Sequence, residues 1–180
     1  MKFDPQKHRR RSVRLKGYDY SQSGAYFVTI VAWQREMLFG EIVDGVVKLN
    51  EMGEIVREEW ERTAIVRSHV ELGEYVVMPN HVHGILVFVD DMVGATRRVA
   101  PTNTTTLQSG SLGAVMAQFK SIVTKRINGL QNVTGRPVWQ RNYYEHIIRN
   151  EHEMDRIHRY IKSNPSQWAE DDENPNCVNQ

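Results

Sequence analysis

The pattern of hydrophobic and polar residues divides the chain into segments that predict strands and helices. A hairpin is predicted over residues 41–48, because the dipeptide Asp44-Gly45 tolerates the positive φ of a tight turn. Four longer segments are rich in β-branched, aliphatic or aromatic residues, which is typical of strands. These segments are residues 25–33, 70–77, 81–89 and 138–148.

Three other segments repeat hydrophobic residues at helical spacing. The first carries Met52, Ile55, Val56 and Trp60 on one face. The second covers residues 112–128, and the third covers residues 151–164. The predicted N-caps are Asn50, Ser111 and Asn150, and the predicted stops are Gly129 and Pro165.

Neighbouring strands followed by helices predict an α+β fold, in which an antiparallel sheet carries its helices packed on it. The 180 residues are enough for one domain with a hydrophobic core. We expect a flexible basic arm at residues 1–16, a domain at residues 17–168 and an acidic polar tail at residues 169–180. Residues 90–110 are polar and predict a long loop.

The composition, with 40% hydrophobic and 25% charged residues, is typical of a soluble globular protein. No segment predicts a membrane span or a signal peptide, and the single Cys177 cannot form an internal disulfide, so we expect a cytoplasmic protein. The net charge is only +1, but basic residues gather in two regions that could contact DNA phosphates. The candidates are Arg9, Arg10, Arg11, Arg14 and Lys16 in the arm, with Lys120 and Arg141 further on. A solvated tail explains the arm equally well.

Two histidines stand one residue apart in the predicted strand 81–89. Residues i and i+2 of a strand project from the same face, so His81 and His83 could share one metal ion. Taken alone, such a pair is more often structural than ligating. The residues around the pair favour a role as metal ligands.

The chain resembles the REP-associated tyrosine transposases, which belong to the HUH single-tyrosine transposases. The resemblance covers residues 14–168 in the order and spacing of that family. It is carried by Met78-Pro79-Asn80-His81-Val82-His83, by the opening strand from Tyr18 to Ile30, by Gln118-Phe119-Lys120-Ser121, by the segment from Trp139 to Arg149, and by Tyr160-Ile161-Lys162-Ser163-Asn164-Pro165. It implies the ferredoxin-like or RRM-like antiparallel sheet of HUH nucleases.

The same resemblance implies the chemistry. Tyr160 matches the nucleophile, His81 and His83 match two ligands of a divalent Mg²⁺ or Mn²⁺ ion, and Asn164 matches the position of a third ligand. The expected activity is that of a single-stranded DNA endonuclease and strand transferase. It cleaves and rejoins hairpin-forming repetitive palindromes through a 5′-phosphotyrosine, as a monomer or homodimer associated with the bacterial nucleoid.

Helical spacing supports this set, because Tyr160 and Asn164 are i and i+4 and lie on one side of the last helix, while Met154, Ile157 and Ile161 face the core. Two other functions stay open. One is a non-catalytic nucleic-acid-binding module, and the other is a hydrolytic metallo-phosphodiesterase. Only one of the adjacent tyrosines at 143 and 144 can face the site, and we expect them to pack or to stack on bases.

Overall fold

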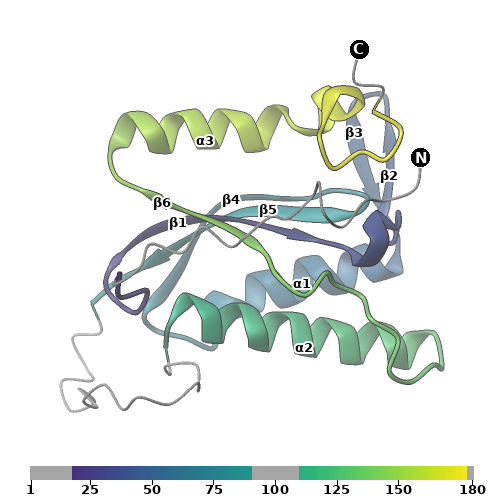
Figure 1. Ribbon diagram of the computed structural model, residues 1–180, viewed down its shortest axis with the longest axis horizontal. Helices are drawn as coiled ribbons and strands as arrows, with labels where there is room; N and C mark the ends of the chain where they lie inside the picture. The colour runs from purple at the N-terminus through teal and green to yellow at the C-terminus, as the bar shows by residue number, and fades with distance from the viewer. Residues whose placement is uncertain (1–17, 91–109, 178–180) are drawn as a thin grey trace.

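A four-stranded antiparallel sheet forms the centre of the molecule (Figure 1), in a computed structural model that describes residues 18–90 and 110–177. The strand order is β4 (Val70–Val77), β5 (His81–Phe88), β1 (Gly24–Val31) and β6 (Tyr144–Ile148). A separate hairpin consists of β2 (Gly40–Val43) and β3 (Val46–Leu49). The predicted arm and most of the predicted loop at 90–110 lie outside the described residues.

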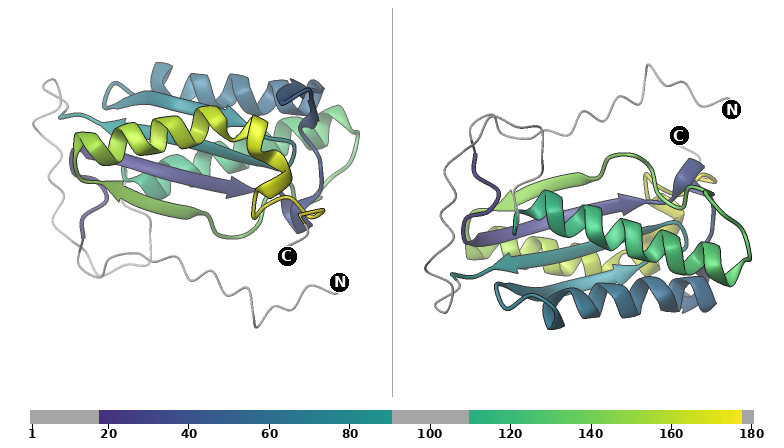
Figure 2. Two further views of the ribbon diagram at one scale, coloured as in Figure 1. Left: turned by 90° about the horizontal axis from the view of Figure 1, so that it is seen from above. Right: turned by 90° about the horizontal axis from the view of Figure 1, so that it is seen from below.

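Helices cover both faces of the sheet. α1 (Glu51–Ile65) and α2 (Leu112–Leu130) lie side by side below it, and α3 (Glu151–Ser163) crosses above it (Figures 1 and 2). The predicted α+β fold with an antiparallel sheet is therefore confirmed. Among the described residues, no helix combines the length and the hydropathy that a membrane crossing requires.

Two hydrophobic clusters attach the helices to the sheet. The larger one lies on the side of α1 and α2, where Trp60 and Phe119 pack edge to face at 5.4 Å between ring centroids. The smaller one lies under α3, where Ile157 and Ile161 contact Phe27 and Ile85. The strands contribute side chains to both clusters, because neighbouring residues of a strand point to opposite faces of the sheet.

Local capping and turn signals are confirmed. Asn50 accepts hydrogen bonds from the backbone N–H groups of Met52 and Gly53, which starts α1. Ser111 and Asn150 cap α2 and α3 through the backbone N–H groups three residues later. The β2–β3 turn places Asp44 at φ 53° and Gly45 at φ 74°, the conformation expected for this dipeptide.

Three predicted boundaries are wrong. The strand predicted over residues 138–148 is reduced to β6, which begins only at Tyr144. The preceding backbone makes one isolated bridge, between Trp139 and Ala32, and its carbonyls at residues 140–142 accept hydrogen bonds from the Lys120 ammonium. α2 continues through Gly129 to Leu130, and the strand predicted to reach residue 33 ends at 31.

The segment after α3 folds back onto the molecule. Residues Pro165–Glu170 form a short 3-10 helix, η2, and the following residues curl around the end of the sheet where β1 ends (Figure 2). Asp171, Glu173 and Asn174 are buried there. Part of the acidic segment predicted as a tail at residues 169–180 therefore reaches the interior.

Candidate active site

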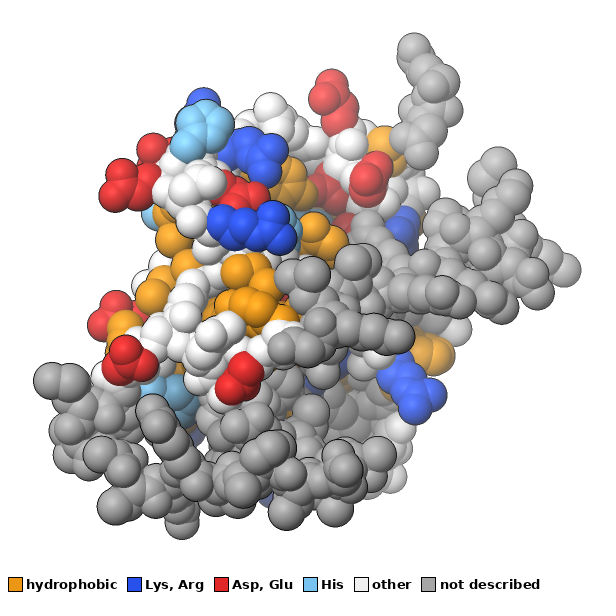
Figure 3. Space-filling view, turned by 60° about the vertical axis from the view of Figure 1, so that its left-hand side comes forward, with side chains coloured by type: hydrophobic (Ala, Val, Ile, Leu, Met, Phe, Trp, Pro, Cys, Tyr) orange, Lys and Arg blue, Asp and Glu red, His pale blue; other side chains and the backbone are white. Residues whose placement is uncertain are grey.

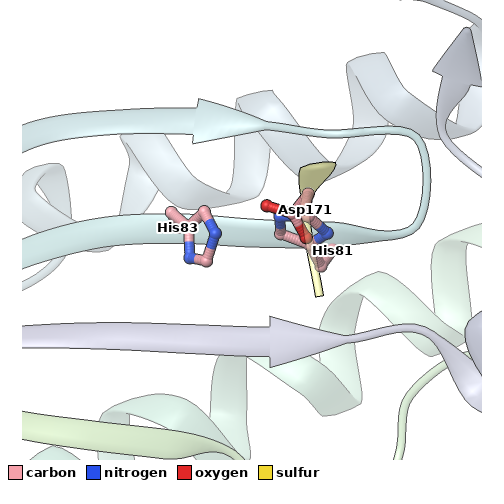
Figure 4. A group of neighbouring side chains, drawn as sticks. All are labelled: His81, His83 and Asp171. Carbon is pink, nitrogen blue, oxygen red and sulfur yellow. The ribbon is translucent and has the colours of Figure 1, made fainter. Parts of the chain in front are cut away.

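His81 and His83 project from one face of β5 (Figure 4). This face lies toward α3, because the Tyr160 hydroxyl of that helix contacts His83. In the sheet register His83 pairs with Thr29 and His81 pairs with Val31 of β1, and antiparallel partners share a face. The two imidazole centroids are 4.4 Å apart, and His81 is 0% and His83 3% exposed. The prediction that the two rings share one face is confirmed.

Asn80 orients the His81 ring. Its Nδ2 donates to the backbone carbonyls of Arg35 at 3.2 Å and of Glu173 at 2.8 Å, which fixes the amide with Oδ1 toward His81. Oδ1 lies 2.9 Å from Nδ1 of His81. An amide oxygen only accepts hydrogen bonds, so Nδ1 carries the proton and Nε2 carries the lone pair that can bind a metal.

Two side chains of β1 orient the His83 ring. The Thr29 hydroxyl lies 2.8 Å from Nδ1, and the Phe27 ring stacks on the imidazole at 5.5 Å between centroids. The other ring nitrogen, Nε2, lies 3.1 Å from the hydroxyl of Tyr160. The histidine of the strand and the tyrosine of the helix thus meet at hydrogen-bond distance.

Tyr160 is placed by the docking of α3. Ile157 and Ile161 are buried against the sheet, and Met154 packs at the edge of the same cluster, as their spacing predicts. This packing leaves Tyr160 on the side of the helix toward His83, with 41% of its surface exposed. A ring at this position is accessible to a ligand from solvent while its hydroxyl contacts the buried histidine.

Asn164 follows α3 as its C-cap residue and is 2% exposed. Its Nδ2 donates to Oδ2 of Asp171 at 2.7 Å. Because a carboxylate oxygen accepts this bond, the amide is fixed, and Oδ1 of Asn164 is buried with no hydrogen-bond partner among the described residues. A buried amide oxygen in this state is an available oxygen ligand.

Asp171 completes a cluster that sequence reasoning did not find (Figure 4). One ligand atom from each of His81, His83 and Asp171 lies within 4.8 Å of the other two, and all three residues are buried. The backbone N–H of Glu173 donates to Oδ1 of Asp171 at 2.6 Å, and Arg35 forms a salt bridge with Glu173 at 3.1 Å. These bonds hold the returning segment against the histidines.

The two described candidates for DNA contact differ in their surroundings. Lys120 donates to the backbone carbonyls of residues 140–142, at 2.5 Å for Gln140, and burial lowers the pKa of its ammonium to about 8. Arg141 is exposed. Lys120 therefore has a structural role before β6, and contact of either residue with DNA stays a prediction, as it does for Arg9 to Lys16 outside the described residues.

The surface beside α3 carries charges of both signs. Figure 3 shows Lys and Arg side chains next to Asp and Glu side chains at the end of the molecule where α3 begins. There Glu153 accepts hydrogen bonds from the Arg149 N–H and from His146, at 2.9 and 2.6 Å, and these bonds lower the pKa of its carboxyl group. Such local pairing stabilises the start of the helix.

Comparisons with known proteins identify a relative and a shared fold. No family model matches the chain. A Haemophilus influenzae protein described as uncharacterized is 38% identical over 174 residues, which covers 94% of this chain and 96% of that protein. The structure of a REP-associated tyrosine transposase bound to a REP hairpin matches with a TM-score of 0.52 at 19% identity, over 84% of this chain and 72% of that one. The chain therefore belongs to one family with the Haemophilus influenzae protein, and it has the fold of the REP-associated tyrosine transposase.

Proposed function

We propose that this protein is a REP-associated tyrosine transposase of the HUH type, which cleaves and rejoins single-stranded DNA beside a hairpin through a 5′-phosphotyrosine. One observation carries the proposal. The Tyr160 hydroxyl lies 3.1 Å from Nε2 of His83, in the same site as the cluster of His81, His83 and Asp171. A nucleophile and metal-ligating groups within one small volume are what phosphodiester transesterification needs.

The buried donor set fits a divalent cation. Nitrogen and oxygen ligands are offered by the two imidazoles, the Asp171 carboxylate and the Asn164 Oδ1 that has no hydrogen-bond partner among the described residues. Asn80 and Thr29 orient the two imidazole rings through contacts to their Nδ1 atoms. Carboxylate and carbonyl oxygens suit Mg²⁺ and Mn²⁺. A cation bound there would neutralise charge that develops on a non-bridging phosphate oxygen.

The residues of this chain would carry out the bond changes. The Tyr160 oxygen forms a bond to the phosphorus atom, and the bond from phosphorus to the 3′-oxygen of the preceding nucleotide breaks. The phenolic proton leaves Tyr160, and the departing oxygen takes up a proton to become a free 3′-hydroxyl. Reversal of the same step rejoins strands without ATP, because the phosphotyrosine conserves the phosphodiester linkage.

The proposed substrate is DNA that folds into a hairpin with a single-stranded flank. The structural neighbour is bound to a REP hairpin, and this chain has the same fold. The basic arm, Arg141 and the accessible atoms of the Lys120 side chain would add contacts to DNA phosphates. Salt-sensitive binding of hairpin DNA is therefore expected.

A covalent adduct tests the proposal directly. The full-length protein is incubated with a 3′-labelled hairpin oligonucleotide and Mn²⁺ and then denatured, so that a strand attached through its 5′-phosphate carries the label on the protein. Labelled protein is expected for the wild type and for Tyr143→Phe and Tyr144→Phe, and none is expected for Tyr160→Phe or in excess chelator. His81→Ala and His83→Ala should also lose the adduct while still binding the DNA.

The outcomes separate the competing functions. Cleavage without labelled protein would indicate hydrolysis by water, as in a metallo-phosphodiesterase. Binding without cleavage at any metal concentration would indicate a non-catalytic DNA-binding module. An adduct that persists in Tyr160→Phe but disappears in Tyr143→Phe or Tyr144→Phe would assign the nucleophile to the segment around β6.

A further inference from the structure

Tyr144 lies on the same face of the sheet as the candidate active site. It is the first residue of β6, the edge strand, and it pairs with Thr29 of β1, which in turn pairs with His83 of β5. The three side chains therefore form one row across the sheet. Adjacent strands are about 4.8 Å apart, so the row places the Cα of Tyr144 roughly 10 Å from that of His83.

Aromatic contacts connect Tyr144 to Tyr160. The Phe27 ring contacts both tyrosines edge to face, with centroid distances of 6.2 Å to Tyr144 and 6.0 Å to Tyr160. Phe27 is 8% exposed, whereas Tyr144 is 40% and Tyr160 is 41% exposed. The three rings thus form a continuous strip with a buried centre and an accessible ring at each end.

The neighbouring tyrosine shows that this exposure is specific to Tyr144. Tyr143 packs against the large core on the side of α1 and α2, although it differs from Tyr144 by only one position. Core packing thus explains the aromatic residue at 143. It does not explain a second aromatic residue that is exposed on the face of the candidate site, where only Phe27 separates it from Tyr160.

We propose that Tyr144 is a stacking platform for an unpaired nucleobase of the DNA strand that Tyr160 attacks. Every base offers a π face to an aromatic side chain, so an exposed tyrosine next to the reacting phosphate holds a single strand without reading its sequence. The phenol of Tyr144 also gives a polar edge beside the apolar ring. This inference rests on the proposed function, and it assigns to β6 the positioning of the strand.

The test measures coupling between Tyr144 and one base. Full-length protein carrying Tyr160→Phe, which leaves the DNA intact, is titrated with hairpin oligonucleotides whose single-stranded flanks carry one abasic site at successive positions. At the stacked position, Tyr144→Ala is expected to raise the Kd about 5- to 150-fold for intact DNA and to have little further effect on the abasic DNA. Tyr144→Phe should retain the affinity, because the ring remains. Ile65→Ala, which changes an exposed residue at the end of α1, serves as the control.

A second measurement reports on the stacked base directly. With 2-aminopurine at the stacked position, the wild-type ring should quench the fluorescence, and Tyr144→Ala should restore it. Equal losses of affinity on intact and abasic DNA at every flank position would overturn the inference, as would the absence of binding to these oligonucleotides. Adduct formation by the wild type is measured on the same DNA. An adduct without coupling refutes only the stacking role, and coupling without an adduct refutes only the proposed transesterification.

Discussion

The hydroxyl of Thr29 provides a sharp test of how the site is oriented. Thr29 is 4% exposed, and its Oγ1 lies 2.8 Å from Nδ1 of His83. Thr29→Val keeps the shape of the side chain and its place in β1 but removes this partner of the imidazole. If His83 binds a metal, loss of the group that orients its ring should weaken Mn²⁺ binding about 10- to 100-fold.

The same change should also cost stability, because a buried polar group loses a hydrogen bond. We expect about 1–3 kcal/mol from this loss. Thr63→Val is a matched control. Thr63 is 3% exposed in α1 on the other face of the sheet, and its hydroxyl donates to the Glu59 carbonyl at 3.0 Å. The control should lose stability without a change in Mn²⁺ affinity.

Calorimetric titration with Mn²⁺, urea unfolding and the rate of adduct formation are measured for the wild type and both variants. The reasoning predicts that Thr29→Val alone loses metal affinity and adduct rate. It would be refuted if Thr29→Val bound Mn²⁺ as tightly as the wild type. It would also be refuted if Thr63→Val lost the same affinity, since the effect would then report general destabilisation.

Two further predictions concern the scaffold. Gly84→Ala should destabilise the fold by about 1–3 kcal/mol in urea unfolding, because the new Cβ would lie 2.2 Å from Cζ2 of the buried Trp60. Gly129→Ala is the control and should not destabilise the fold, because a Cβ at that position would have nothing within 4 Å. Burial lowers the pKa of Lys120 to about 8 from 10.5, so the unfolded chain binds more protons between these pH values and stability should rise with pH. Relative to Lys120→Met, the wild type should therefore gain free energy of unfolding from about pH 8 to 10.5. A difference in free energy of unfolding between the two proteins that stays constant across this pH window would contradict the lowered pKa of Lys120.

Local sequence signals account for most of the elements and for half of the site. The caps at Asn50, Ser111 and Asn150 and the turn at Asp44-Gly45 involve neighbouring residues, so short-range patterns determine them. The common face of His81 and His83 follows from the two-residue period of a strand. The inward side of α3 follows from the helical period of its hydrophobic residues, which also places Tyr160.

Only the tertiary structure decided the groups that surround these residues. Asp171 reaches the histidines because the chain reverses after Pro165 and is held by the bonds of Asn80 and Arg35 to residue 173, contacts that join distant positions. No periodic pattern encodes such contacts, because they depend on where separate elements dock. For the same reason the shortened β6 could not be predicted: the carbonyls before it bond to the Lys120 ammonium on α2, a partner that only the packed fold brings near.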